Sequence, residues 1–140
     1  MTTSIDTNVL VSLWDVDDAL HRAARVALDA ALARERLAIS GIVYAELLAA
    51  PGRSGMFLDK FCEEAGIGIE WELGERALRL AGEAFQGYAA RRKKQKGTAP
   101  RRILADFLIG AHATLNGYKL LTMDEGVYRV AFPKLAIVEV

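Results

Sequence analysis

The sequence has few of the features that hold small extracellular domains together or anchor a chain in a membrane. Its one cysteine, Cys62, can form no internal disulfide and cannot build a cysteine metal site alone. No apolar run approaches the roughly 18 residues of a membrane span, and the first residues show neither the charged segment nor the long apolar segment of a secretion signal. We therefore expect a cytoplasmic protein with no membrane partner, in which Cys62 is a small buried side chain.

The sequence also lacks the motifs of several phosphate-handling proteins. It has no Gly-Lys-Ser or Gly-Lys-Thr step for a nucleotide phosphate loop. The early segment Asp6-Thr7-Asn8 has neither the adjacent acid pair of a phosphoacceptor signalling domain nor the second acid of a phosphatase-type Asp-x-Asp, and no lysine ends a late strand. The only histidines, His21 and His112, leave open a metal-independent ribonuclease that uses two imidazoles as acid and base. Their surroundings are more typical of a surface residue and a packed residue.

What the sequence does have is an alternation of strand-like and helix-like segments. With 140 residues, 52% of them hydrophobic, the chain is long enough to bury a core as one domain over residues 1–140. The patterns predict strands at about 2–5, 37–39, 67–71, 118–122 and 136–140, and helices at about 17–36, 42–50, 56–65, 74–91 and 102–115. Strands separated by helices predict an α/β fold with a parallel sheet and helices on both of its faces.

Four acids stand in apolar surroundings, whereas most of the eighteen lie beside other polar residues. Asp6 and Asp124 each follow a predicted strand, while Glu46 and Asp106 lie in the opening turns of helices that start near the same edge. Burying one ionised carboxylate costs several kcal/mol unless it is paired, protonated or bound to metal. Because ligands bind at the carboxyl ends of strands in such sheets, we expect the four acids to share one site.

A cluster of carboxylate oxygens without thiolate or imidazole ligands favours Mg²⁺ or Mn²⁺. Asn8 and Thr122 are neutral oxygen donors, which we expect to orient water or a ligand beside the ion. Three of the acids have an ordinary explanation when taken alone: Asp6 can cap a helix, Glu46 can pair with an arginine, and Asp124 can be a turn residue. Asp106 alone favours a functional role, because its helix has no polar face on which to place it. The four together favour a shared site.

The charge distribution is uneven although the net charge is zero. Seven cations and no acid lie between Ala89 and Arg102, which leaves 11 cations and 18 acids elsewhere, a net charge of −7. A compact basic tract on an acidic body indicates a local anionic partner.

The four acids lie in the segments 5–10, 40–47, 104–113 and 121–124. In sequence and in order along nearly the whole chain, these segments resemble those of PIN-domain proteins, and within that group the VapC-type toxins of bacterial toxin–antitoxin pairs. The resemblance implies a three-layer α/β/α fold with a five-stranded parallel sheet. Met123 departs from the family pattern, which often has a cation there, so substrate contacts at this position stay open.

The resemblance also implies an activity and partners. The matching acids would hold one or two Mg²⁺ or Mn²⁺ ions, and the protein would hydrolyse RNA, leaving a 5′-phosphate and a 3′-hydroxyl. A small antitoxin, whose tail lies across the site, and a homodimer are implied partners. Trp14 could belong to such a surface, although core packing is the more common fate of tryptophan.

We assign roles within this interpretation as follows. Asp6, Asp106 and Asp124 are the predicted direct or water-mediated metal ligands, and Glu46 is either a ligand of a second ion or the base that orients the attacking water. The predicted RNA contacts are the cations of the basic tract, with a solvated loop or a surface for an acidic protein as alternatives: Arg91, Arg92, Lys93, Lys94, Lys96, Arg101 and Arg102. The alternative function is a PIN fold that binds RNA or protein without catalysis.

Overall fold

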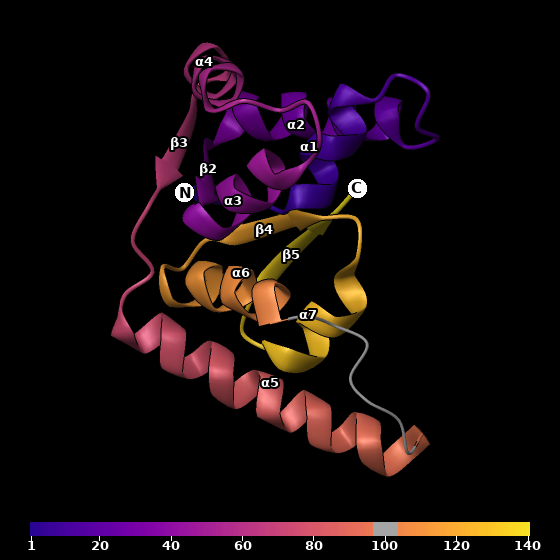
Figure 1. Cartoon of the computed structure of the whole chain (residues 1–140), viewed down its shortest axis with the longest axis vertical. Helices are drawn as coiled ribbons and strands as arrows, with labels where there is room; N and C mark the ends of the chain where they lie inside the picture. Colours follow the sequence, from indigo (N-terminus) through magenta and orange to yellow (C-terminus); the bar gives the residue numbers. More distant parts are fainter. Residues whose placement is uncertain (97–103) are drawn as a thin grey trace.

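The chain forms a five-stranded sheet in which every neighbouring pair of strands is parallel, with the order β3-β2-β1-β4-β5 (Figure 1). A computed structural model describes residues 1–96 and 104–140, without the side chains of residues 95 and 96. The strands are β1 (Thr2–Ile5), β2 (Arg36–Ser40), β3 (Ile67–Glu70), β4 (Lys119–Thr122) and β5 (Ala136–Glu139). The predicted parallel sheet is thus confirmed.

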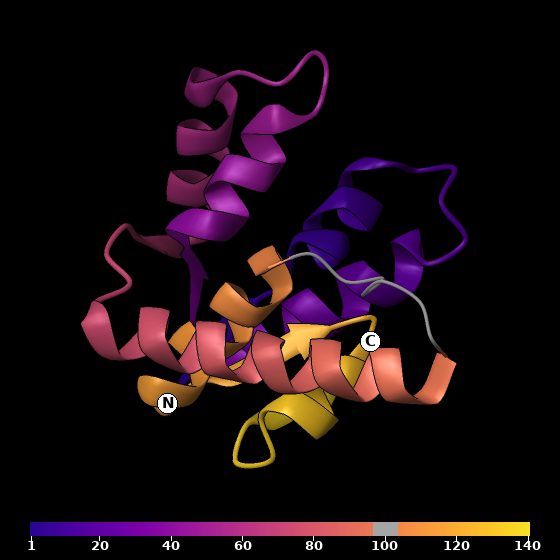
Figure 2. The same cartoon turned by 60° about the horizontal axis from the view of Figure 1, so that its bottom comes forward.

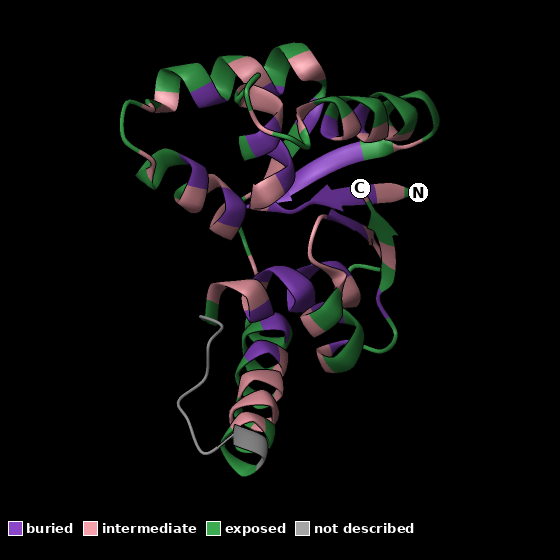
Figure 3. Cartoon of the chain, turned by 90° about the vertical axis from the view of Figure 1, so that its right-hand side faces the viewer, coloured by how far each residue is buried: buried purple, intermediate pink, exposed green. Residues whose placement is uncertain are grey.

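Helices cover both faces of this sheet, which confirms the predicted three layers. They are α1 (Thr7–Trp14), α2 (His21–Arg34), α3 (Gly41–Ala49), α4 (Gly55–Ala65), α5 (Glu75–Lys96), α6 (Leu104–Leu115) and α7 (Glu125–Ala131). Figures 1 and 3 show α1 to α4 on one side of the sheet and α5 to α7 on the other. Within the described ranges, no helix has the length and apolar character that a membrane crossing requires.

The central strands are buried because helices pack on both of their faces. In β1, Ser4 and Ile5 are fully buried, and α6 is buried along most of its length. Gly110 allows α6 to pack closely, because a Cβ at this position would lie only 2.4 Å from the ring of Phe132. Cys62 is 3% exposed within the core, as its apolar surroundings predicted.

The helices differ from the predictions at three places. The helix α1 was not among the predicted ranges, and α2 begins at His21 rather than at about Asp17. The Asp18 carboxylate accepts a hydrogen bond from the Leu20 N–H and holds a turn ahead of His21. The short helix α7 was not predicted, since seven residues carry too little periodicity to distinguish a helix from a turn.

The helix α5 also runs further than predicted, to Lys96 rather than about Arg91. The added residues are arginine, lysine and glutamine, which all favour helix. The first five cations of the basic tract therefore lie on a helix rather than in a loop.

Candidate active site

Asp6 lies at the carboxyl end of β1, where the strand passes into α1, and it is 5% exposed. Its backbone N–H donates to the Leu121 carbonyl at 2.9 Å, so the ladder between β1 and β4 continues up to this residue. Its Oδ1 caps α1 by accepting from the Thr7 N–H at 2.8 Å. Its Oδ2 accepts from the hydroxyls of Thr122, at 2.8 Å, and Tyr128, at 3.1 Å. Asp6 is therefore a helix cap, but capping accounts for only one of its two oxygens.

The surroundings of the Asp6 carboxylate contain no positive charge to balance it. Its three hydrogen-bond donors are neutral, and among the described residues no lysine or arginine forms an ion pair with it. Burial raises the pKa of Asp6, and the negative charge of Asp106 adds to that rise, against the lowering by the three hydrogen bonds. A bound cation would stabilise a buried carboxylate that has no positively charged partner.

Thr122 and Asn8 join the ends of β4 and β1. The Thr122 hydroxyl, which is fully buried, donates to Asp6 and accepts from the Asp124 N–H at 3.1 Å. The Asn8 side-chain oxygen accepts from the Met123 N–H at 3.4 Å. These contacts hold the backbone of residues 123 and 124 beside Asp6, so both residues position the chain at this edge.

Glu46 and Asp106 come from helices on different sides of the sheet that contact each other, α3 and α6. Ser40 caps α3 through its hydroxyl, which accepts from the Val43 N–H at 3.4 Å. The half-buried Glu46 carboxylate accepts from the Thr7 hydroxyl at 2.5 Å. Because Thr7 directly follows Asp6 in the chain, this hydrogen bond places Glu46 beside the end of β1.

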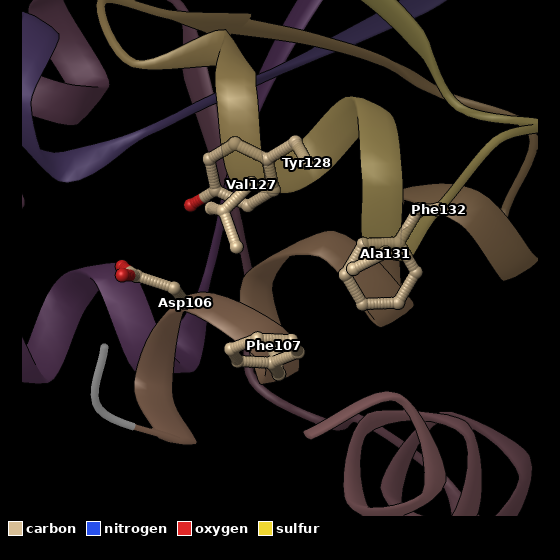
Figure 4. A pocket seen from close by; sticks show the side chains of 6 residues that line it. All are labelled: Asp106, Phe107, Val127, Tyr128, Ala131 and Phe132. Atoms are coloured by element: carbon tan, nitrogen blue, oxygen red, sulfur yellow. The ribbon is translucent and has the colours of Figure 1, made fainter. Parts of the chain in front are cut away.

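Asp106 lies in the first turn of α6 and lines a narrow crevice with Phe107, Val127 and Tyr128. Figure 4 shows its carboxylate and the Tyr128 hydroxyl pointing to the same side. The Tyr128 hydroxyl donates to Asp6, so one residue that lines the crevice also contacts the buried carboxylate. The predicted acids thus lie at one edge of the sheet, and Asp106 is close enough to Asp6 for its negative charge to raise the pKa of Asp6.

The donor set fits a hard divalent cation in its chemistry, because all four acids supply carboxylate oxygens. The side chains are not closed around a common point: in residues 1–96 and 104–140, no three His, Cys, Asp or Glu side chains lie close enough to hold one ion together. The structure therefore brings Asp6 and Asp106 near each other. Glu46 is hydrogen-bonded through its carboxylate to Thr7, and Asp124 through its backbone N–H to Thr122.

Sequence reasoning did not identify two residues of this site, Thr7 and Tyr128. Thr7 touches both Asp6 and Glu46, and the position directly after an acid at a strand end was the available signal. Tyr128 lies about one helical turn after Asp124, a spacing that would have been visible had α7 been predicted.

The two histidines do not form an acid–base pair open to substrate. His112 is 1% exposed, with its Nε2 3.1 Å from Glu70 and its ring edge-on to Tyr118. Burial lowers the pKa of His112, more than the nearby Glu70 raises it. His21 Nδ1 lies 3.1 Å from the Ser12 carbonyl. His112 is therefore a packed residue, as its apolar neighbours indicated.

The described cations of the basic tract lie on the last turns of α5. Arg91 and Arg92 line a groove against α7, while Lys93 and Lys94 are exposed. The Lys96 side chain and the predicted contacts Arg101 and Arg102 lie outside the described residues.

Trp14, at the end of α1, is half-buried and packs edge-on against Phe61, with ring centroids 4.9 Å apart. The Arg53 guanidinium lies 4.4 Å from the centre of its ring. Intramolecular packing thus accounts for this tryptophan.

Comparisons with known proteins identify the family and support the fold. Residues 4–133 match the PIN domain family. The chain is similar to VapBC2 from Rickettsia felis, solved bound to a DNA fragment from its promoter, with 22% identity, a TM-score of 0.68 and coverage of 100% of this chain and 99% of that chain. It is similar to a toxin–antitoxin complex from Klebsiella pneumoniae, with 20% identity, a TM-score of 0.67 and 99% of each chain covered.

It is also similar to VapBC-1 from nontypeable Haemophilus influenzae, with 22% identity, a TM-score of 0.68 and coverage of 99% of this chain and 98% of that chain. A search of curated proteins found no match. At these identities the solved structures support the fold.

Proposed function

The chain belongs to the PIN-domain family, and from that membership we propose that it is the nuclease toxin of a toxin–antitoxin pair, which hydrolyses RNA with the help of Mg²⁺ or Mn²⁺. The observation that carries the proposal is the Asp6 carboxylate, which is 5% exposed, faces only neutral donors and lies near a second carboxylate. A structural carboxylate this deeply buried would be expected to have a cationic partner. In a site that binds a divalent cation, the metal ion takes the position of that cationic partner.

We assign the metal-ligand roles from the family resemblance, and the positioning roles from the hydrogen bonds. Asp6, Asp106 and Asp124 would hold the ion, directly or through water. A bound divalent cation would lower the pKa of a water molecule and neutralise charge on the phosphate. Thr122 and Tyr128 fix the orientation of the Asp6 carboxylate by donating to its Oδ2.

Glu46 has two possible roles, ligand of a second ion or base for the attacking water. In either role Thr7 orients it, because the Thr7 hydroxyl donates to its carboxylate. The Thr7 backbone N–H also holds Asp6. One residue thus links the two acids.

We propose an antitoxin as the protein partner, and a homodimer in the cytoplasm as the unit it binds. The antitoxin is supported by one of the similar solved structures, which is described as a toxin–antitoxin complex. Arg91, Arg92, Lys93 and Lys94 are proposed RNA contacts, because an acidic site repels the phosphate backbone and needs cations nearby.

The test is incubation of the purified chain with total cellular RNA and Mn²⁺, with and without chelator, followed by mapping of the new ends. We expect cleavage that leaves 5′-phosphates, is lost with chelator, and is lost in Asp6→Asn and Asp106→Asn. Equal cleavage by the native chain and both variants would contradict the assignment. Chelator-resistant cleavage with cyclic-phosphate ends would indicate a histidine mechanism instead.

A second candidate is a PIN fold that binds RNA or protein without cutting it. The observation that favours it is the spacing of the acids, since no three of them gather in the described part of the chain. Titration of Mn²⁺ separates the two functions. A binding module would take up no ion at Asp6, whereas the nuclease would.

A further inference from the structure

A groove of about 340 Å³ lies between the end of α5 and α7. Tyr88, Arg91 and Arg92 line it from α5, and Val127 and Val130 line it from α7. Figures 1 and 2 show α7 beside α5, and the two helices are in contact. We call this the α5–α7 groove.

The α5–α7 groove adjoins the crevice that contains Asp106. Val127 lines both of them. Tyr88 packs against Phe107 of the crevice, with ring centroids 5.4 Å apart. The groove therefore lies next to the residues that line the crevice with Asp106.

The groove offers two guanidinium groups, and no acid is among the described residues that line it. Arg92 is half-buried, and its Nε is buried without a hydrogen-bond partner in the described structure. Leaving a buried donor unsatisfied is costly, so the position favours an added acceptor. Arg91 folds back along α5, because its Nη1 would lie 3.4 Å from a Cβ placed at Gly87.

The other lining groups suit the rest of a nucleotide. Guanidinium groups bind phosphate oxygens in a two-pronged geometry. An aromatic ring such as Tyr88 stacks on any base, and the valine side chains offer apolar contact. The volume is near the lower end of the roughly 300–1,000 Å³ of small-ligand pockets, which fits one nucleotide and not a duplex.

We propose that the α5–α7 groove binds one nucleotide of single-stranded RNA next to the bond that the acids cleave. Its phosphate contacts Arg92 and Arg91, and its base contacts Tyr88 and the valines of α7. The inference rests on the proposed RNA cleavage and deepens it, because the groove admits only a base that is out of its helical stack. The substrate is thus a single-stranded or looped segment.

The test measures binding and cleavage separately. Binding is followed by fluorescence anisotropy of a fluorescein-labelled 12-nucleotide RNA of random sequence, in chelator, so that no cutting occurs. We expect Arg92→Ala to weaken binding about tenfold and to reduce the slope of log K against log salt by about 0.7, the value for one phosphate contact to a single strand. Arg76→Ala, an exposed arginine at the other end of α5, is the matched control and should change binding less than twofold.

Two further variants test the other wall and the stacking. Val130 is 63% exposed, so Val130→Asp should leave the fold intact and weaken binding at least fivefold by repelling phosphate. Tyr88→Ala should weaken binding about tenfold, the lower part of the range for loss of a stacked base. Tyr88→Phe, which keeps the ring, should bind like the native chain. In cleavage, the groove variants should raise KM while kcat is nearly unchanged.

The possible failures can be told apart. If the native chain cleaves RNA and both Arg92→Ala and Val130→Asp bind RNA like it, the groove proposal is wrong and the nuclease proposal stands. If binding depends on the groove but no RNA is cut with Mn²⁺, the nuclease proposal is wrong and the groove is still an RNA site. If these variants bind RNA normally but lose a protein partner, the groove is a protein interface and the proposal is overturned.

Discussion

A carboxylate lies at each end of the β1–β4 strand pair, and the surroundings of the two carboxylates are opposite in charge. At the amino end, Thr3 of β1 and Lys119 of β4 are register partners, and both donate hydrogen bonds to Glu35. The Lys119 hydrogen bond, together with that from Thr3, lowers the pKa of Glu35. At the carboxyl end, Asp6 faces neutral donors and the charge of Asp106, and its pKa is raised by burial.

The difference indicates what each end of the sheet is for. A carboxylate matched by an ammonium group stabilises the fold as it stands. A buried carboxylate without a cation destabilises the fold until something positive arrives. The carboxylate at the amino end therefore stabilises the fold. The carboxylate at the carboxyl end lowers the stability of the metal-free fold, which we attribute to its proposed role in binding the metal.

The largest expected difference between the two ends is in RNA cleavage. Asp6→Asn should reduce kcat/KM by about 10³-fold or more, because loss of a metal ligand removes several kcal/mol of transition-state stabilisation. Glu35→Gln, which makes the same chemical change at the other end, should stay within about threefold of the native chain. Both are measured on one RNA under saturating Mn²⁺. A comparable loss in both variants would show that the strand ends do not differ in function.

The second expected effect concerns the hydroxyl that orients Asp6. Tyr128→Phe removes a donor to Asp6 Oδ2 and keeps the buried ring. Loss of such an outer partner typically costs about 10- to 100-fold in metal affinity or activity, and we expect kcat/KM to fall within that range. The control is Tyr118→Phe, which removes a hydroxyl that donates to Glu70 instead. If Tyr118→Phe lowers activity as much, the effect is not specific to Asp6.

The third effect is on stability in the absence of metal. At pH 7, Asp6→Asn should raise the free energy of unfolding by about 1 kcal/mol, because it removes an uncompensated buried charge at the expense of function. Glu35→Gln should lower it by about 1 kcal/mol, because it breaks a charge-assisted hydrogen bond. Denaturant unfolding in chelator measures both. Destabilisation by Asp6→Asn would mean that its carboxylate is structural.

The smallest effect is the pH dependence of these stability differences. The folded-state pKa of Asp6 is raised, so its destabilisation is full above that pKa and disappears as the pH falls toward 3.8, where the unfolded chain also binds the proton. The folded-state pKa of Glu35 is lowered, so its stabilisation is present above 4.5 and is lost as the pH falls through the folded value.

As the pH falls, the native chain should therefore first become as stable as Asp6→Asn. Only at a lower pH should it lose its greater stability over Glu35→Gln. Thermal unfolding from pH 7 to pH 3 follows both differences. The opposite order would contradict the contrast between the two carboxylates.

Much of the fold was predictable because its signals are local. Each of the five strands was predicted to within two residues at either end, since short apolar runs are bounded by turn or capping residues such as Ser40 and Gly66. The helix α1, the start of α2 and the existence of α7 were not predicted. The start of α2 depends on a side-chain turn at Asp18, and α7 depends on packing against α5, α6 and β5, neither of which produces a periodic pattern in the sequence.

The site was predictable in its location and not in its contacts. The apolar neighbours of Asp6 and Asp106 indicated burial, and parallel topology brings strand ends to one edge. The hydrogen bond from Tyr128 to Asp6 spans 122 positions in the chain. The pairing of Glu46 with Thr7 spans 39. Contacts of this range depend on the packing of α3 and α7, so the sequence alone could not reveal them.

The central claim, that the buried Asp6 carboxylate holds a divalent cation together with the neighbouring acids, is tested most directly by Mn²⁺ binding. Electron paramagnetic resonance of free Mn²⁺ during titration counts the bound ions in the native chain, Asp6→Asn and Glu35→Gln. We predict one or two bound ions for the native chain and for Glu35→Gln, and at least tenfold weaker binding for Asp6→Asn. No binding to the native chain, or equal binding to Asp6→Asn, would contradict the account.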